Sequence, residues 1–348
     1  MNEATPHNDE HQSRATIRDI ARHAGVSVAT VSRVINGRPD VSAETREAVL
    51  RHVRAHNFSS NRSARALSSG RTGLVGFTMP FAHAEYFAAI LSGATEALYE
   101  QDLRAVLCPT LHEHERELTL LDRLMHGTTD AAILLLPTET SDELKALQAH
   151  GYPFVVADPR YPLDEGIPAV SAAHWAGAKA AVDHLLQLGH RRIGLITGDR
   201  GWAATEGRVD GYHTALAAAG VLPTPELVAE GDFLLDSGRE AAFRLLDLAE
   251  PPTAILASND NMAVGAMQAA RARGLRIPED LSLVGYDDSE KASIVAPALT
   301  TVRQPLEELG RTAVSLLTRL LDRQRVEALH VELATKLVVR ESTAPPRA

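Results

Sequence analysis

Hydrophobic residues recur at helical spacing in three short stretches near the start of the chain. Thr16 is of the residue type that caps a helix and Gly25 of the type that ends one, so the first helix is predicted between them. Ser27 caps a second helix, Val28 to Asn36, and Ser42 caps a third. Helices joined by so short a turn are typical of a helix-turn-helix module. The apolar stripes are Ile17, Ile20, Ala21 and Ala24 in the first helix and Val49, Val53 and Phe58 in the third.

From Gly73 onward, short apolar runs alternate with amphipathic stretches. Fully apolar runs such as 131–137 predict buried strands of parallel sheets that are covered on both faces. The stretches between them, including 87–101 and 175–188, predict the covering helices. About eight such units exceed one sheet, and 171–173 predicts a crossing into a second lobe. The predicted fold class is α/β: a three-helix head followed by two lobes of doubly wound parallel sheet.

Charge is distributed unevenly along the 348 residues. Residues 14–70 hold ten arginines against four acidic residues, whereas the whole chain has a net charge of −10. A basic surplus at one end is typical of nucleic-acid binding, and a merely solvated face would not confine it there. No apolar run approaches the roughly 20 residues of a membrane span, and the polar start lacks a signal peptide's apolar core. The single Cys108 excludes an internal disulfide. We therefore expect a cytoplasmic protein that binds DNA and no membrane.

The second predicted helix begins with small or polar residues that suit the major groove. Arg33 can reach guanine, while Thr30 and Ser32 can bond bases or phosphates. A purely structural three-helix bundle, the alternative, does not need a polar face flanked by arginines. The predicted DNA-binding residues of the head are Thr16, Ser27, Val28, Ala29, Thr30, Ser32, Arg33 and Asn36.

These residues lie in TIRDIARHAGVSVATVSRVINGRPDVSAETREAV, which strongly resembles the DNA-binding head of the lactose/galactose-repressor (LacI/GalR) family. The resemblance continues through NRSARALSSGRTGLVGF, similar to the family's hinge helix, and through ASNDNMAVGAM and LSLVGYDDSE. It implies a periplasmic-binding-protein-like effector domain and a repressor of carbohydrate uptake or catabolism genes that a sugar releases from its operator. The implied domains are a disordered tail (1–13), a helix-turn-helix domain (14–58), a hinge (59–72) and an effector-binding and dimerisation domain (73–343). Within the last of these, the first lobe is about 73–173 and 304–330, and the second lobe is about 174–303 and 331–343.

In that family the hinge folds on the operator, and its leucine wedges into the central base step. By position this leucine is Leu67, with Ala64 packing nearby and Asn61 at the hinge start. A segment of this length is too short for a stable isolated helix, and an apolar wedge is a known device for kinking DNA from the minor groove. An ordinary core role for Leu67 is the alternative. Ser60 and Phe58 replace a common proline and tyrosine, which leaves the stiffness of the hinge entry open.

Ligands of doubly wound sheets bind outside the carboxyl ends of the strands. The resemblance also places Arg208, Asn259 and Asp287 at the family's effector positions. Arg, Asn and Asp side chains suit vicinal hydroxyls and an aromatic face stacks on a sugar, so we expect a carbohydrate; a purine or other co-repressor is the alternative. Arg208 and Asp287 should be open to solvent in the open state of the cleft, because an unpaired buried charge is unfavourable. The predicted effector-binding residues are Tyr86, Asp158, Arg160, Trp202, Arg208, Phe233, Asn259 and Asp287.

Several neighbouring residues have two interpretations. Asp260 is expected to cap the helix that follows it. Trp202 contacts ligand or only packs the lobes together. Glu85 departs from the family pattern, and it either replaces a hydroxyl partner or faces solvent.

An enzyme is the distant alternative. No GxGxxG follows a strand, no P-loop is present, and Cys108 lacks the surroundings of a nucleophile. His112, His114 and His126 suggest a metal, but they lie in a charged stretch that favours solvated surface. We therefore expect no cofactor and no metal. The resemblance implies a homodimer on a pseudo-palindromic operator, because the C-terminal heptad helix of tetrameric members has no counterpart before Pro345 and Pro346.

Overall fold

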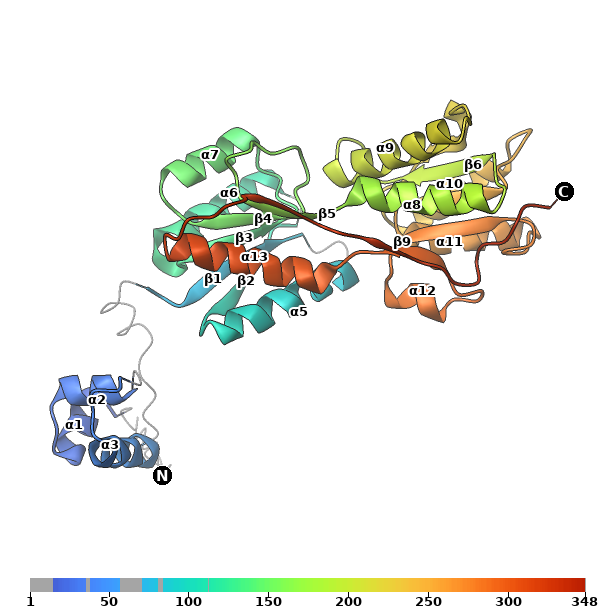
Figure 1. Ribbon diagram of the computed structural model, residues 1–348. Helices are drawn as coiled ribbons and strands as arrows, with labels where there is room; N and C mark the ends of the chain where they lie inside the picture. Colours follow the sequence, from blue (N-terminus) through green and yellow to red (C-terminus); the bar gives the residue numbers. More distant parts are fainter. Residues whose placement is uncertain (1–14, 36–37, 57–70, 81–83, 112, 348) are drawn as a thin grey trace, which may run out of the picture. The chain divides into compact units, whose positions relative to one another are not determined.

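The protein consists of two compact units, divided between Thr72 and Gly73. The computed structural model describes residues 15–35, 38–56, 71–80, 84–111 and 113–347 (Figure 1). The predicted tail, Asn36 and the hinge residues Asn61, Ala64 and Leu67 lie outside these ranges.

The described part of the N-terminal unit is a bundle of short helices, α1 (Ile17–Ala24), α2 (Val28–Ile35) and α3 (Ala43–Ala55). A capping box starts α1: Thr16 Oγ1 accepts from the Asp19 N–H, and the Asp19 carboxylate accepts from the Thr16 N–H at 2.9 Å. Gly25 ends the helix with a left-handed φ of 66°. The predicted helix-turn-helix is therefore confirmed. Its buried core consists of Ile20, Ala21, Val31, Val34 and Val49.

The first lobe of the large unit is a six-stranded parallel sheet with helices on both faces (Figure 1). Its order is β11 (His330–Leu333), β5 (Ala169–Ala172), β4 (Phe154–Ala157), β3 (Ala131–Leu135), β1 (Leu74–Met79) and β2 (Arg104–Pro109). Successive residues of β3 face opposite cores, because side chains alternate along a strand: Ile133 faces one and Leu134 the other. The helices of this lobe are α5 (Ala84–Glu100), α6 (His114–Arg123), α7 (Ser141–Ala149) and α13 (Leu306–Leu321).

The second lobe repeats this arrangement around another six-stranded sheet. Its order is β12 (Lys336–Val338), β10 (Thr300–Arg303), β9 (Ser282–Asp287), β8 (Ala254–Ala257), β6 (Ile193–Thr197) and β7 (Val228–Glu230). Its helices are α8 (His174–Gln187), α9 (Ala203–Ala218), α10 (Leu235–Leu246), α11 (Asp260–Ala272) and α12 (Glu290–Ile294). The two predicted doubly wound lobes are confirmed, with one difference: β12 runs antiparallel to β10.

The chain passes between the lobes after β5, after β10 and after β11. The first and third crossings are bonded together, because the Ala173 N–H donates to the Leu333 carbonyl at 2.8 Å and Thr335 Oγ1 donates to the Ala173 carbonyl at 3.2 Å. Since β11 belongs to the first sheet, this lobe continues to Leu333, a few residues past the expected boundary at about 330.

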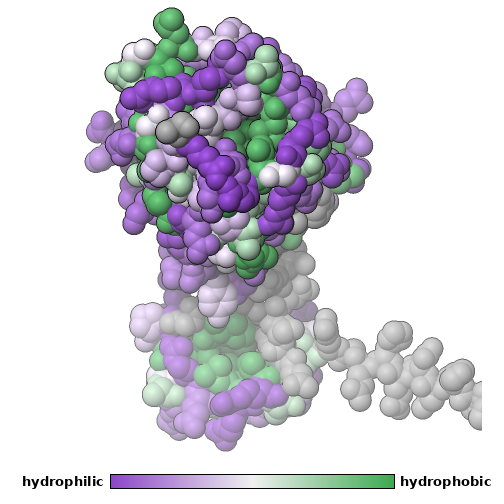
Figure 2. Space-filling model, turned by 90° about the vertical axis from the view of Figure 1, so that its right-hand side faces the viewer, coloured by the Kyte–Doolittle hydropathy of each residue, from purple (hydrophilic) through white to green (hydrophobic). Residues whose placement is uncertain are grey.

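The end of the second lobe faces the viewer in Figure 2, and its surface is mainly hydrophilic with hydrophobic areas between. Leu222 and Ile294 are exposed hydrophobic residues of this lobe. Within the described ranges, no helix has both the length and the apolar character needed to cross a membrane.

Candidate functional site

Helix α2 carries most of the predicted DNA-binding residues on its exposed side. Ser27, Val28, Ala29 and Arg33 are exposed, and Val28 remains 42% exposed although it is apolar. Ser27 Oγ accepts from the Thr30 N–H at 3.1 Å, so this serine also caps the helix. The Arg33 Nε atom lies 3.6 Å from the Asp40 carboxylate, an exposed ion pair that a DNA contact would have to replace. Thr16 is engaged in the capping box of α1.

A cleft between the two lobes encloses a cavity of about 740 Å³. Arg160 is not among the lining residues, but its guanidinium carbon lies 4.4 Å from the centroid of the Trp202 ring. The other predicted effector residues all line the cavity: Tyr86, Asp158, Trp202, Arg208, Phe233, Asn259 and Asp287.

A hydrogen-bonded network crosses the cleft floor from one lobe to the other. The Tyr86 hydroxyl donates to Asp158, whose other oxygen lies 3.1 Å from His174 Nε2. His174 Nδ1 lies 3.3 Å from Arg208 Nη2 and must accept, since a guanidinium only donates. The histidine proton is therefore on Nε2 and is donated to Asp158. Tyr86 and Asp158 belong to the first lobe, while His174 and Arg208 belong to the second.

The protonation states of this network follow from its surroundings. Burial raises the pKa of Asp158, but hydrogen bonds from His174 and Tyr86 and the charge of Arg208 outweigh burial and leave that pKa below its ordinary value. Burial and the neighbouring Arg208 lower the pKa of His174. At neutral pH the network therefore contains an ionised Asp158 and a neutral His174. The sequence reasoning missed His174, although it follows the predicted crossing at 171–173 directly.

Arg208 is buried in this structure, whereas solvent access is expected for the open state of the cleft. Its side chain is held by protein groups in place of water: it donates to the Ser258 carbonyl, and its guanidinium carbon lies 3.9 Å from the centroid of the Tyr286 ring. The residue is only 4% exposed. The positive charge thus lies under the cleft as a fixed part of its floor.

Asp287 is half-buried at the end of β9, with a left-handed φ of 109°. Its Oδ1 accepts from Gln304 Nε2 at 2.7 Å. Burial raises the pKa of Asp287 to about 7; Asp260 adds to the rise, while Arg208 opposes it.

The interpretation of Asp260 as a helix cap is wrong. Asn259 caps α11, since its Oδ1 accepts from the Met262 N–H at 2.9 Å. The buried Asp260 carboxylate instead accepts from the Ser289 N–H at 2.7 Å and from Thr301 Oγ1 at 2.6 Å. Asn259 Nδ2 donates to the Phe233 carbonyl, so both ends of the Asn259 amide already have protein partners at the cavity wall.

Aromatic rings form one wall of the cavity. The ring centroids of Trp202 and Phe233 lie 5.4 Å apart with their planes tilted by 34°. A Cβ atom on Gly198 would lie 1.9 Å from the Phe233 ring, so only glycine permits this ring position. Trp202 lines the cavity and also packs against the cores of both lobes, which combines its two interpretations.

Two charged side chains meet where the lobes face each other at the cavity. Glu85 of α5 lies 3.2 Å from Lys291 of α12, and both line the cavity. Glu85 therefore has a protein partner across the cleft, which neither of its two interpretations foresaw.

Several buried polar atoms around the cleft have no hydrogen-bond partner in the structure. Such groups are unfavourable when buried unless something satisfies them, and a ligand rich in hydroxyls offers both donors and acceptors. These atoms belong to residues that line the cavity or adjoin its lining: Thr205 Oγ1, Arg208 Nε, Ser258 Oγ, Ser289 Oγ and Gln304 Oε1.

The histidines that suggested a metal have other contacts. His114 Nε2 lies 3.0 Å from Glu143, and His126 Nδ1 lies 2.7 Å from the Asp122 carbonyl. His112 lies outside the described ranges. The residues that the structure describes contain no group of three or more metal-ligating side chains arranged to hold a metal ion.

Comparisons with known proteins agree on one family. Residues 16–61 match the family described as "Bacterial regulatory proteins, lacI family", and residues 182–343 match "Periplasmic binding protein-like domain". The chain is 37% identical over 343 residues to the HTH-type transcriptional regulator CelR of Thermobifida fusca, covering 96% of this chain and 99% of the relative. It is 34% identical over 332 residues to the HTH-type transcriptional repressor PurR of Haemophilus influenzae (strain PittEE), covering 94% of this chain and 98% of the relative.

The solved structures agree. A lac repressor dimer bound to operator and the anti-inducer ONPF is similar with a TM-score of 0.85 and 30% identity, covering 95% of this chain and 100% of that one. A CelR–cellobiose complex is similar with a TM-score of 0.72 and 35% identity, covering 94% and 100%. Head, lobes and cleft thus have counterparts along nearly the whole length of these relatives. The chain belongs to the LacI family of bacterial regulatory proteins.

Proposed function

We propose that this chain is a repressor of carbohydrate uptake or catabolism genes, and that a sugar bound in the interlobe cleft releases it from operator DNA. One observation carries the sugar assignment: the cavity combines an aromatic wall, Trp202 and Phe233, with a polar floor that contains Asp158, Arg208 and Asp287. Aromatic rings pack on the C–H face of a sugar, while carboxylates and a guanidinium bind its hydroxyls.

The charge of the lining supports a neutral ligand. Carboxylates outnumber cations there, since only Arg208 and Lys291 are positively charged among the lining residues. A phosphorylated ligand would meet unfavourable repulsion, whereas hydroxyl groups would donate to the carboxylates. The acidic lining residues are Glu85, Asp158, Asp260, Asp287, Asp288 and Glu290.

The relatives support the same class of ligand. The CelR structure contains cellobiose, and another solved structure of the family contains ribose. Relatives of comparable identity include the transcriptional repressor PurR, and a purine or other co-repressor is the alternative ligand. The relatives are named as transcriptional regulators and repressors, so we assign the cleft a sensing role.

The DNA partner follows from the head. Residues Ser27, Val28, Ala29, Thr30, Ser32 and Arg33 of the α2 region, with Asn36 after it, contact the operator, and Leu67 of the hinge wedges into it, with Asn61 and Ala64 beside it. A homodimer in the cytoplasm reads a pseudo-palindrome with two such heads. Coupling of about 1–3 kcal/mol between the sites would change operator affinity about 5–150-fold, enough for regulation.

The experiment is a thermal-shift screen of the full chain against cellobiose, ribose, other mono- and disaccharides, and purine bases. A sugar at 100 times its dissociation constant stabilises the folded state by about 2.7 kcal/mol, because it binds only that state. Asp158→Asn should lose the shift, whereas Glu226→Gln, an exposed change in the second lobe outside the cavity lining, should keep it. Stabilisation by a purine with none by any sugar would reject the sugar assignment, and DNA release should then be tested with the base.

A further inference from the structure

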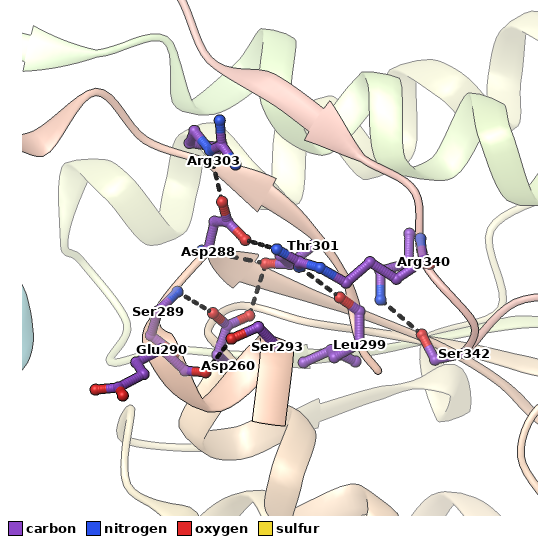
Figure 3. A network of polar contacts seen from close by, with 11 residues as sticks. Asp260, Asp288, Ser289, Glu290, Ser293, Leu299, Thr301, Arg303, Arg340 and Ser342 are labelled. Carbon is purple, nitrogen blue, oxygen red and sulfur yellow. Dashed lines mark hydrogen bonds and ion pairs between the residues drawn. The ribbon is translucent and has the colours of Figure 1, made fainter. Parts of the chain in front are cut away.

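Asp288, next to the cleft residue Asp287, is held by two arginines (Figure 3). Its Oδ2 lies 2.5 Å from Arg303 Nε, and its Oδ1 lies 2.5 Å from Arg340 Nη2. The Asp288 side chain is only 7% exposed, so both ion pairs are shielded from water at the carboxylate. We call Arg303, Asp288 and Arg340 the clamp.

The two arginines lie in the second lobe, on segments that adjoin crossings between the lobes. Arg303 is the last residue of β10, directly before the second crossing, and Arg340 follows β12, which the chain enters from the third crossing. β10 and β12 pair with each other, with Arg303 opposite Lys336. Arg340 Nη1 also donates to the Leu299 carbonyl at 2.8 Å. One carboxylate therefore ties the strand that leads into the second crossing to the segment beyond β12, the strand that follows the third crossing.

The clamp is continuous with the cleft. Asp287 and Asp288 have left-handed φ angles of 109° and 59°, which non-glycine residues adopt only where their surroundings hold them. The Asp288 N–H donates to Thr301 Oγ1 at 3.3 Å, and the next N–H, of Ser289, donates to Asp260 (Figure 3). Gln304, in the second crossing itself, donates to Asp287. A ligand that bonds Asp287 thus acts on a loop that is fastened to the crossings.

We propose that Asp288 is a positioning residue that transmits occupancy of the cleft to the interlobe hinge. Segments held by two shielded ion pairs move together, so a shift of loop 287–289 turns the crossings and changes the angle between the lobes. The proposal rests on the proposed function, because it explains how a ligand in this cleft would regulate. Without the clamp, the ligand-free lobes separate more readily.

A tryptophan at the lobe interface makes the movement measurable. Trp202 of the second lobe stacks on Arg160 of the first, and the chain has one other tryptophan, Trp175. In full-length protein carrying Trp175→Phe, acrylamide quenching of Trp202 reports how often the lobes part. Asp288→Asn should raise the quenching constant about twofold or more, as the population of open molecules grows, while cooperative melting is retained. Glu240→Gln removes an exposed carboxylate of α10 in the same lobe, outside the cavity lining, and should leave quenching unchanged.

A second variant separates transmission from simple support of the fold. The Arg303 side chain is 55% exposed, so Arg303→Gln should fold normally. It should also raise the quenching constant, and it should add nothing to Asp288→Asn, since that change already removes the ion pair with Arg303. Unchanged quenching in Arg303→Gln, or an equal rise in Glu240→Gln, would overturn the proposal. The measurement needs neither sugar nor DNA, so failure of the sugar screen and failure of the clamp are distinguishable.

Discussion

Two carboxylates at the cleft, Asp158 and Asp287, have opposite protonation behaviour. Asp158 accepts hydrogen bonds from His174 and Tyr86, which hold its pKa below the ordinary value in spite of burial. Asp287 accepts a hydrogen bond from Gln304, and burial raises the pKa of Asp287 to about 7. The first lobe thus presents a fixed acceptor to the cleft, while the second lobe presents a group that accepts or donates according to pH.

The raised pKa of Asp287 gives stability a pH dependence. The folded protein holds a proton that the unfolded chain loses near pH 4, so this residue stabilises the fold at low pH and loses that contribution as pH rises toward 7. Asp287→Asn removes the ionisation. We therefore compare the free energy of unfolding of the ligand-free variant with that of the native chain by chemical denaturation at pH 5 and pH 8. The difference between the two proteins should shift in favour of the variant by about 2 kcal/mol from pH 5 to pH 8.

Glu290→Gln is the matched control, because it removes an exposed carboxylate only three residues along the chain, at the start of α12. Its difference from the native chain should be equal at the two pH values. The explanation fails if Asp287→Asn behaves in the same way.

The sequence predicts which residues lie at the cleft better than it predicts the contacts that each of them makes. The rule that ligands meet strand ends selected Asp158 and Asp287, and both line the cavity. The sequence did not indicate that Asn259, and not Asp260, caps α11, nor that His174 joins the two lobes. Those roles depend on partners such as Thr301 and Arg208, which are distant in sequence and meet only in the folded chain.

At the scale of elements, α5 and α13 pack unusually closely. A Cβ atom on Gly310 of α13 would lie 2.1 Å from the Ile90 carbonyl oxygen, and one on Gly93 of α5 would lie 1.9 Å from the Glu307 carbonyl oxygen. These contacts are with main-chain atoms, which cannot rotate away. The glycines therefore set the distance between two helices that cover the first sheet.

Gly310→Ala should force α13 away from α5. We expect a loss of about 1–3 kcal/mol or more in the free energy of unfolding, as overpacking of a close interface typically gives, measured by urea denaturation. Ser315→Ala changes an exposed position of the same helix and should have little effect. A native-like midpoint for Gly310→Ala would show that the helices can move apart freely.

The elements differ in how well the sequence predicts them. Buried strands such as β3 have no polar position, so their apolar runs are unmistakable. β11 alternates exposed and half-buried residues, and β12 has only three residues, so neither produces an apolar run. The antiparallel direction of β12 follows from its entry out of the other lobe, which no local pattern encodes.

For the whole molecule, the dominant electrostatic feature is the basic segment 14–70 of a chain whose net charge is −10. Operator binding should release counterions from phosphates, so affinity should fall about 10³–10⁵-fold between 50 and 200 mM salt if six to ten phosphates are contacted. The test is fluorescence anisotropy with an operator selected from random DNA. Stabilisation by a neutral sugar should change little over the same range, and a flat DNA response would exclude a phosphate-dominated contact.

Neither lobe is continuous in sequence, and this dictates the order in which the protein can acquire its parts during synthesis. The head is complete once α3 has emerged. The early strands of the first lobe are synthesised next, but this lobe cannot complete its fold without α13 and β11, which are translated after most of the second lobe. Until then the apolar face of α5, including Ile90, has no covering helix. The nascent chain is therefore exposed to aggregation or chaperone capture through most of its translation, and it can contact DNA before it can respond to a ligand.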